Sequence, residues 1–492
     1  MRLRVLIITL LAVAFLGALD HTVVSTSLAT IAGELGALSH MSWIVVAYTL
    51  ASTVLLPVIG KLGDILGPRR VFLASLAVFV LASAVCGFAQ DMVQLLAARV
   101  VQGMSAAGIQ LMSQTIVARV TTPRERPRAL GIVGAAFPVA IVVGPAIGGL
   151  LVDGLGWPWV FWINVPIGIA AFIAASLVIP PLPAGERHRF DIPGAVVMTL
   201  AMVALILALT WLGDDALRGP ALGLAAAAAA LFAAFIAIER RAASPVLPVH
   251  VMRGRTVLSC LALSAVMGLG FFSIVAFMPT YVQMAFRTSA TVSGLVPMAT
   301  VFGMLASNLA TGHLASRSGR YRVYAIVGTA IATAGLVVMS LLPPGAPLWA
   351  PMAIMAVVGV GQGMFMNLII AVVQSVVPTT ALGSITATMN LLRQIGATIG
   401  TAAIGAAVAV QVAAALPGVD VETLTPQAVR EAPGELQATV AELFAHVFAP
   451  IFAVLAGVYA LGIVAAILLP GGRLSDEPGR DRAPEPAATR TA

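Results

Sequence analysis

Ionisable residues inside apolar segments are the places where this sequence could do chemistry. Asp20 lies well inside an apolar run at 5–29, and Arg99 lies inside another at 93–117. A carboxylate in hydrocarbon costs on the order of 3 kcal/mol on insertion scales, so such a residue normally serves a function. Burial favours the neutral carboxyl, which makes Asp20 a candidate for taking up a proton. The alternative is a structural ion pair that does not titrate.

Arg99 is the candidate partner of Asp20. With a helical rise of about 1.5 Å per residue, Arg99 lies ~9 Å and Asp20 ~15 Å below the outer ends of their segments, which permits contact. An arginine keeps its proton, but its approach favours the ionised carboxylate and so promotes proton release. His21 titrates near physiological pH and could take part, although a polar lining residue is the simpler interpretation.

A second intramembrane arginine, Arg393, lies near mid-depth in a later apolar segment. It is a candidate charge partner for a carboxylate or for an anionic part of a substrate, or it could bond helix carbonyls. Polar, aromatic and thioether side chains in other spans are candidates for lining a substrate cavity, and each could equally be ordinary lining. These are Tyr48, Gln110, Phe137, Met364, Asn367 and Asn390.

A glycine-rich motif follows the second apolar segment. It reads Gly60-Lys-Leu-Gly-Asp64-Ile-Leu-Gly67-Pro-Arg69-Arg70, and we expect it to form a loop. Its glycines allow a tight turn, and its charged residues can form ion pairs. The simple interpretation is a set of anchoring charges, and the functional one is a latch that holds the inner face closed.

A second motif reads Gly144-Pro145-Ala-Ile-Gly148-Gly149 and lies inside the fifth apolar segment. Proline removes a helical hydrogen bond and kinks the helix. Glycines four residues apart let a neighbouring helix approach closely. The motif predicts a tight, bendable contact between the two halves of the protein, or plain helix packing.

The composition requires a membrane to position these residues. Hydrophobic residues make up 60% of the chain and charged residues 10%, against about 25% charged residues in soluble domains. Runs of roughly 20 apolar residues recur, which is the length that crosses a bilayer. We predict an all-α membrane protein with 14 transmembrane helices, at 5–29, 43–59, 71–89, 93–117, 129–152, 159–179, 192–212, 220–238, 257–278, 292–310, 323–342, 348–373, 382–412 and 447–469.

The basic residues set the orientation of these spans. With the N-terminus inside, the inner segments hold 22 of the 27 lysines and arginines, which is the positive-inside pattern. Both termini are therefore expected in the cytoplasm, and the net charge of +7 needs no nucleic acid to explain it. The sequence has no phosphate-binding loop, catalytic triad or metal-ligand cluster. We expect no enzyme activity and no cofactor, with protons as the coupling ion.

An internal repeat divides the chain. The pattern at 60–70 recurs at 312–322, and Ala129-Leu130-Gly131 recurs as Ala381-Leu382-Gly383, both at an offset of 252 residues. This predicts two parallel six-helix halves at 1–180 and 257–470, which is the major facilitator arrangement. A two-helix insert with cytoplasmic linkers would occupy 181–256, an outer loop 413–446, and a disordered cytoplasmic tail 471–492.

The outer loop carries a second helix signal. Thr425-Pro426 resembles a helix start, with a capping residue before a proline at the first helical position. The residues that follow place an apolar stripe on one helical face, namely Leu436, Val440, Leu443, Phe444 and Val447. The pattern is typical of a helix lying on the membrane surface, or of a loop packed on the bundle.

Together these motifs resemble the 14-span drug:proton antiporters of the major facilitator superfamily, the EmrB/QacA type. The resemblance rests on five segments spread along the first half, namely 19–24, 43–48, 60–70, 95–103 and 144–149, and on Trp157-Pro-Trp159-x-Phe161-x-Ile163-Asn164-Val165-Pro166. Ile65 stands where the family usually has an arginine in the loop motif, and Ala140 where it usually has a glycine.

The resemblance implies multidrug efflux from the bacterial cytoplasmic membrane, in exchange for protons. Asp20 would bind the proton, Arg99 would modulate it, and the 60–70 motif would control the inner gate. The partners would be the lipid bilayer and hydrophobic, often cationic small molecules, with the protein acting as a monomer. The alternatives are export of an endogenous lipid or metabolite, and a membrane-bound sensor, for which no extra soluble domain is present.

Overall fold

The computed structural model describes residues 2–36, 40–183, 190–212, 217–241, 249–415, 426–431 and 433–476. Within these ranges the chain is helical, apart from turns and one isolated β-bridge. Thirteen helices are long and apolar enough to cross a membrane, and a bent helix pair makes a fourteenth. The predicted all-helical membrane fold is therefore confirmed.

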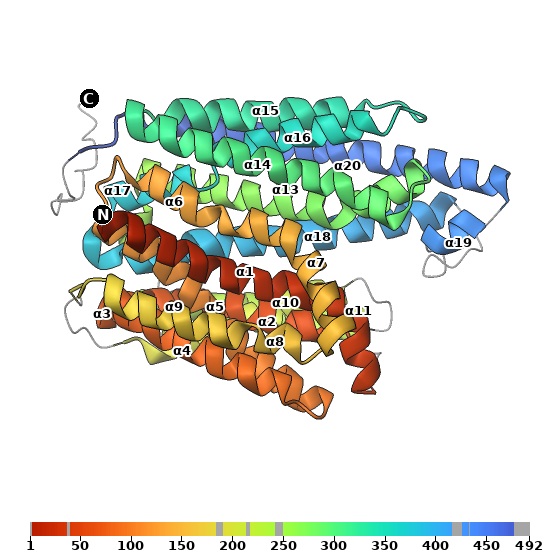
Figure 1. Ribbon diagram of the computed structural model, residues 1–492. Helices are drawn as coiled ribbons and strands as arrows, with labels where there is room; N and C mark the ends of the chain where they lie inside the picture. The colour runs from red at the N-terminus through yellow and green to blue at the C-terminus, as the bar shows by residue number, and fades with distance from the viewer. Residues whose placement is uncertain are drawn as a thin grey trace.

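The helices form two bundles that lie side by side (Figure 1). The N-terminal half contains α1 (Arg2–Glu34), α2 (Trp43–Val54), α3 (Leu56–Leu66), α4 (Pro68–Gly87), α5 (Met92–Val120), α6 (Arg126–Gly134), α7 (Ala136–Leu155), α8 (Trp159–Trp162) and α9 (Asn164–Val178). The C-terminal half contains α13 (Arg255–Ala285), α14 (Ala290–Ser318), α15 (Arg322–Ser340), α16 (Trp349–Gly363), α17 (Leu368–Val376), η2 (Thr379–Ala381), α18 (Leu382–Ala415), α19 (Pro426–Glu431) and α20 (Gly434–Leu468).

Three further helices connect the halves, namely α10 (Ile192–Trp211), α11 (Arg218–Glu239) and α12 (Val249–Met252). Met198 and Met202 of α10 and Phe235 of α11 share an apolar cluster with Val54 of α2 and Leu391 of α18. The inserted pair therefore packs where a helix of each half meets the other.

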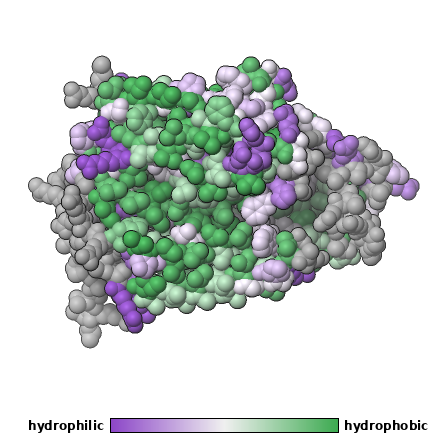
Figure 2. Space-filling view, turned by 90° about the horizontal axis from the view of Figure 1, so that it is seen from below, coloured by the Kyte–Doolittle hydropathy of each residue, from purple (hydrophilic) through white to green (hydrophobic). Residues whose placement is uncertain are grey.

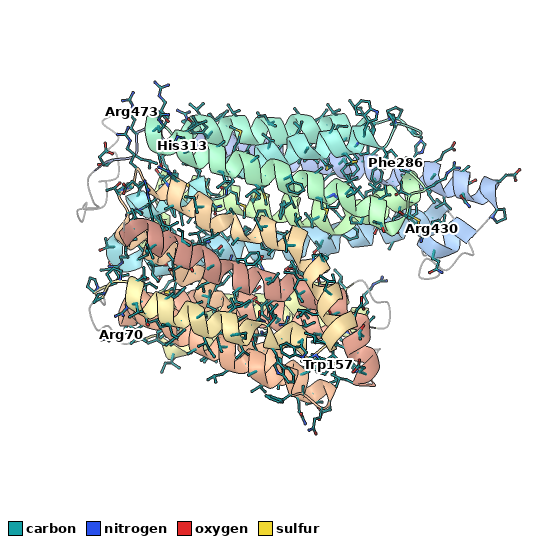
Figure 3. The ribbon with its side chains drawn as sticks, in the orientation of Figure 1. Arg70, Trp157, Phe286, His313, Arg430 and Arg473 are labelled. Atoms are coloured by element: carbon teal, nitrogen blue, oxygen red, sulfur yellow. The ribbon has the colours of Figure 1, made fainter. Side chains whose placement is uncertain are left out.

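The start of α1 and the end of α20 lie at the same end of the molecule (Figure 1). We call this the inner end, because the arginine distribution predicts that it faces the cytoplasm. Arg70, His313 and Arg473 lie at this end, whereas Trp157 and Arg430 lie at the opposite, outer end (Figure 3). Between the two ends a broad apolar surface covers the face shown in Figure 2, as a lipid-facing surface requires.

Prolines explain two of the breaks inside spans. Proline lacks an N–H and its ring crowds the carbonyl four residues earlier. Pro57 follows the end of α2, where the chain bends by 46° into α3. Pro138 follows the break at Ala135, one turn after α6 ends. Pro145, at which we predicted a kink, lies inside α7, which continues past it as one helix.

Two predicted loops are helical. Gly60 and Asp64 lie on α3, which continues to Leu66, and the turn comes only at Gly67. Gly67 has a φ of +90°, a conformation that favours glycine. At the other end of the chain α19 begins at Pro426, but the capping residue predicted before it lies outside the described residues.

The apolar stripe predicted for a membrane-surface helix belongs to α20. This helix begins at Gly434 and continues without a break through the last span. Val440 and Phe444 are buried, and the ring of Phe448 lies 5.0 Å from that of Tyr281 on α13. The buried residues of the stripe, Val440, Phe444 and Val447, therefore pack on the C-terminal bundle, which is the second of the two alternatives.

Candidate functional site

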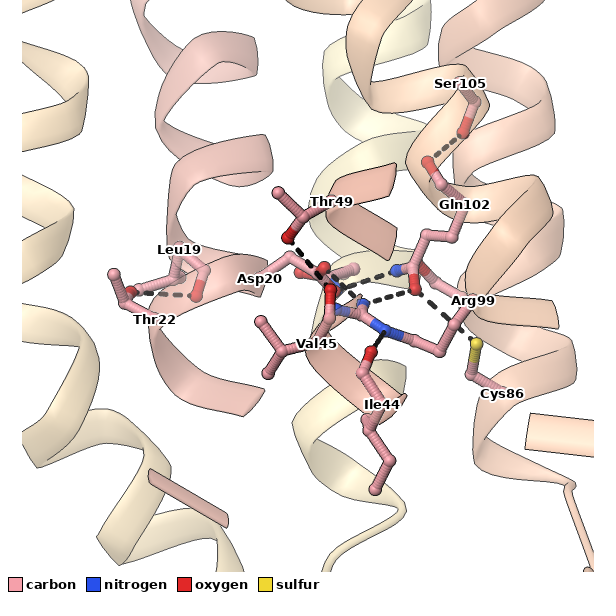
Figure 4. A network of polar contacts seen from close by, with 12 residues as sticks. Leu19, Asp20, Thr22, Ile44, Val45, Thr49, Cys86, Arg99, Gln102 and Ser105 are labelled. Carbon is pink, nitrogen blue, oxygen red and sulfur yellow. Dashed lines mark hydrogen bonds and ion pairs between the residues drawn. The ribbon is translucent and has the colours of Figure 1, made fainter. Parts of the chain in front are cut away.

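Asp20 lies at the centre of a buried polar cluster in the N-terminal half (Figure 4). Its Oδ2 accepts a hydrogen bond of 2.8 Å from Nη1 of Arg99, and the two side chains are 1% and 0% exposed. Its Oδ1 accepts from the side-chain amides of Gln102 and Asn164, each at 2.8 Å. Three donors from α5 and α9 thus converge on a carboxylate from α1.

Arg99 is held on several sides. Its Nη1 also donates to Oε1 of Gln102 at 2.8 Å, and its Nε donates to the carbonyl of Ile44 at 3.3 Å. The guanidinium carbon lies 4.2 Å from the ring centre of Tyr48 and 5.7 Å from that of Phe161. Cation–π contacts of this kind stabilise a desolvated arginine, so Arg99 is fixed in place.

Close helix packing brings these side chains together. Gly103 of α5 lies against the backbone carbonyl of Tyr48 on α2, and any Cβ there would overlap it. Gly144 and Gly148 of α7 lie against Thr22 and Thr26 of α1 in the same way. Gly144 and Gly148 therefore pack within the N-terminal half, beside Asp20, which is the plain helix packing that we gave as the alternative to a contact between the halves.

His21 lies beside the cluster and not in it. Its ring is 5.9 Å from that of Tyr48, and it makes no hydrogen bond or ion pair within the described part of the chain. Tyr48, which we predicted would line a cavity, is buried against Arg99. Gln102 and Asn164 were not among the predicted site residues, although both lie in motifs quoted above. The sequence marks each of them only as a polar amide inside an apolar segment.

A second polar cluster joins the two halves at the inner end. The carboxylate of Asp64 on α3 accepts hydrogen bonds from the backbone N–H groups of Gly383 and Ser384 at 2.7 and 2.8 Å. It also accepts one from the hydroxyl of Ser384 at 2.7 Å. These groups begin α18, so Asp64 caps a helix of the opposite half, where a negative charge is favourable.

The remaining residues of the 60–70 motif have different surroundings. A Cβ on Gly60 would lie 2.7 Å from the carbonyl oxygen of Gly383, so this glycine allows α3 and α18 to touch. Arg69 donates to the carbonyl of Ser176 at 2.7 Å, which is a contact within the N-terminal half. Arg70 is exposed, and its side chain makes no hydrogen bond or ion pair with the described residues. Only Gly60 and Asp64 of the five predicted residues bridge the halves.

Arg124 and Arg126 extend this seam. Arg124 donates to the carbonyls of Ser316 and Arg317 at the end of α14, at 2.9 and 2.7 Å. Arg126 donates to the carbonyl of Gln374 on α17. Arginines of the α5–α6 connection thus hold backbone groups of the C-terminal half, which a pattern of basic residues alone could not predict.

Amides continue the contact towards mid-depth. Asn390 of α18 donates to Oε1 of Gln114 on α5 at 2.8 Å, and it accepts a hydrogen bond from Arg393. Arg393 is 8% exposed and has no carboxylate within ion-pair distance among the described residues. The partner of Arg393 in this structure is therefore the amide of Asn390 and not a carboxylate.

The other cavity candidates are dispersed. Asn367 donates to Asn308 at 3.1 Å within the C-terminal half. The ring of Phe137 lies 6.5 Å from that of Phe272 across the interface. Met364 packs near Gly328 of α15, so it faces its own half.

Gln110 shows how far the halves stay in contact. It lies one helical turn outward from Gln114 on α5, so both side chains point towards the C-terminal half. Gln114 is buried against Asn390, whereas Gln110 is exposed. All recorded hydrogen bonds between the halves involve residues from the level of Thr53 inward. Among the described residues the halves are therefore joined from the level of Thr53 to the inner end, and the side chain of Gln110 is left exposed beside this contact.

Comparison with known proteins decides the family. The model of the Major Facilitator Superfamily matches residues 10–401. The chain belongs to this superfamily. It is therefore a membrane transporter of the secondary type and not an enzyme.

Several superfamily members are similar along most of the chain. An uncharacterized MFS-type transporter of Mycobacterium tuberculosis is 34% identical over 93% of this chain and 68% of its own length. The multidrug transporter protein MdtP of Bacillus subtilis is 34% identical over 82% of this chain and 75% of its own. The crystal structure of the human organic anion transporter MFSD10 matches with a TM-score of 0.64 at 14% identity, covering 94% of this chain and 99% of that one.

Proposed function

We propose that this transporter exports hydrophobic drugs or antibiotics across the bacterial cytoplasmic membrane in exchange for protons. The observation that carries the proposal is the buried Asp20, held by Arg99 and two amides in the middle of a transporter half. The similarity to a multidrug transporter of Bacillus subtilis supports export of drugs. A single chain contains both halves, and we propose that it works as a monomer.

Asp20 can couple proton binding to helix movement. All three recorded partners of its side chain are donors, an arrangement that suits an ionised carboxylate, which only accepts hydrogen bonds. A proton would remove the charge that attracts Arg99 and would place a hydrogen between donors. The contacts that join α1 to α5 and α9 would then rearrange, and the half would change its packing.

The energy for export would come from proton entry. A membrane potential supplies about 2.3 kcal/mol per charge per 100 mV. Rearrangement of the N-terminal half would reach the inner end through α5, which carries both Arg99 and the interface residue Gln114. Release of Asp64 from the start of α18 would then open the inner gate and expose the interface to the cytoplasm.

The test is transport by purified protein in proteoliposomes with an imposed pH gradient, across a panel of hydrophobic and cationic compounds. We expect Asp20→Asn to lose gradient-driven transport while the protein folds and inserts normally. The matched control is Asp153→Asn, which removes an exposed carboxylate from α7. Unchanged transport by Asp20→Asn would reject Asp20 as the coupling site.

The second candidate is export of an endogenous metabolite or lipid. It is favoured by the 31% identity to a transporter named for the acurin A biosynthesis cluster of Aspergillus aculeatus. The same coupling site would serve both functions, so mutation of Asp20 does not distinguish them. The panel of transported compounds does, because the two functions differ in substrate. Transport of a lipid or a cellular metabolite, with no transport of any drug, would select this alternative.

A further inference from the structure

A pocket of about 340 Å³ opens at the inner end of the C-terminal half, between the start of α15 and the segment that follows α20. Three of its lining residues are arginines, and none is acidic. The lining comprises Arg320, Tyr321, Arg322, Val323, Gly471, Gly472 and Arg473. Figure 3 shows Arg473 on this edge of the molecule, next to the start of α15.

Backbone contacts fix the two walls of the pocket. Arg320 and Arg473 form an isolated antiparallel bridge, and the N–H of Leu474 donates to the carbonyl of Gly319 at 2.9 Å. Leu474 is buried against this turn. The segment after α20 is therefore held beside the α14–α15 turn, and the two arginines come from opposite walls.

The guanidinium groups of the pocket are available to a ligand. Arg320 and Arg473 are exposed, and the described residues offer their side chains no hydrogen bond or ion pair. Arg322 donates through Nη2 to the carbonyl of Ile467 at 2.6 Å, but its buried Nε has no partner. Arginine presents a planar fork of donors that matches the oxygens of a phosphate. The pocket thus suits a phosphate-bearing anion.

The position of the pocket decides what kind of anion reaches it. The apolar span of α15 begins at Arg322, and that of α20 ends at Leu468, so the arginines lie at the edge of the membrane. Val323, Ile467 and Leu468 are exposed apolar residues beside them, at the ends of these spans. A ligand that fits both surfaces has an anionic head group and acyl chains.

We propose that this pocket binds the head group of an anionic phospholipid from the leaflet at the inner end. Arg320 and Arg473 would clasp the phosphate between the two walls, with the acyl chains along the exposed residues at the ends of α15 and α20. Basic pockets at this depth recognise such head groups.

The bound lipid would also brace the closed inner end. The segment that forms one wall continues to Ser475, whose carbonyl accepts a hydrogen bond from the N–H of Arg124 in the N-terminal half. A lipid that ties this segment to α15 would therefore hold a contact between the halves. This role concerns the inner seam and does not depend on which substrate is exported.

The test uses the full chain in neutral detergent, with phosphatidylglycerol and phosphatidylcholine added separately. Retained lipid is counted by native mass spectrometry, and apparent affinity is taken from thermal stabilisation. We expect phosphatidylglycerol to bind at least tenfold more tightly than phosphatidylcholine. The double variant Arg320→Gln/Arg473→Gln is expected to lose this preference, and Arg320→Lys/Arg473→Lys to keep part of it.

Two controls make the result specific. Arg240→Gln/Arg241→Gln removes the same charge from exposed positions at the inner end of α11, and it should leave the preference unchanged. Glycerol phosphate added at millimolar concentration should not displace the lipid. The proposal is overturned if the pocket variant keeps the full preference, if the α11 variant loses it equally, or if glycerol phosphate competes as well as the lipid. None of these readouts requires transport, so they stand apart from the test of antiport.

Discussion

At the scale of single residues, the environment of Asp20 differs from an ordinary buried ion pair. A buried pair that loses one partner is destabilised by about 3–5 kcal/mol, because the other charge stays uncompensated. Here Gln102 contacts both members of the pair, accepting from Arg99 and donating to Asp20. Asn164 adds another donor to Asp20. In the proposed proton exchange, the amide of Gln102 would keep Arg99 partnered when Asp20 takes up a proton.

The role of Asn164 can be tested by truncation. We expect Asn164→Ala to lower stability by about 1–3 kcal/mol, since hydrogen bonds to charged groups contribute that much. Proton-driven transport should fall roughly tenfold, because the link from α9 to Asp20 is lost. Thermal unfolding and proteoliposome transport measure the two effects. Ser83→Ala is the matched control, because Ser83 accepts from Gln102 without touching Asp20. Transport by Asn164→Ala at the original rate would show that this amide is dispensable.

At the scale of elements, glycines let helices of different halves approach closely. Gly60 on α3 meets Gly383 on α18, and Gly312 on α14 meets the carbonyl of Pro127 on α6. The offset of 252 residues relates Gly60 to Gly312, so both seams use equivalent positions of the repeat. Both seams are formed by close backbone contact, and Asp64 adds a hydrogen bond across only one of them.

Gly60→Ala tests the α3–α18 contact. The added Cβ would lie 2.7 Å from both the carbonyl oxygen of Gly383 and the Cβ of Ala387, so the helices must separate. We expect transport to fall at least tenfold in a protein that still inserts, because the inner end no longer closes. The control is Gly223→Ala on α11, where a Cβ meets nothing within 4 Å. Equal transport by both variants would contradict a gate at this contact.

At the scale of the whole molecule, the inner end is closed by two kinds of contact. Arg124 donates to two carbonyls of α14 and also pairs with Asp476 after α20. The ion pair is between side chains that are 36% and 71% exposed, so it should contribute no more than about 1 kcal/mol. The carbonyl contacts should therefore matter more than the salt bridge.

Labelling of a buried cysteine separates the two contributions. Ala129 is buried on α6 at the seam with α14, and the native cysteines Cys86 and Cys260 are both buried. In an Ala129→Cys background, we expect Arg124→Gln to speed reaction with a charged maleimide several-fold, since the inner end opens more often. Asp476→Asn should change the rate by less than about fivefold, which corresponds to 1 kcal/mol. A larger effect of Asp476→Asn than of Arg124→Gln would reverse this ranking.

Much of this architecture could be predicted from local sequence. Spans are visible because apolar runs of membrane length are a property of consecutive residues. Asp20 and Arg99 were identifiable because an ionisable side chain in hydrocarbon is costly wherever it packs. The partners Gln102 and Asn164 were not identifiable, since an amide in a span is only mildly unfavourable. The role of each amide depends on its contact with Asp20, which is 82 residues away from Gln102 and 144 residues away from Asn164 in the sequence.

The sequence by itself therefore determined the helical membrane character and the approximate number of the spans, and it identified the costly carboxylate. Only the tertiary structure decided that the α7 glycines pack on α1, that Asp64 caps a helix of the other half, and that α20 begins before the predicted last span and packs on α13. The physical reason is the distance along the chain over which each effect acts. Hydrophobicity and charge act on each segment separately, whereas close packing and hydrogen bonds depend on which surfaces meet after the helices have assembled.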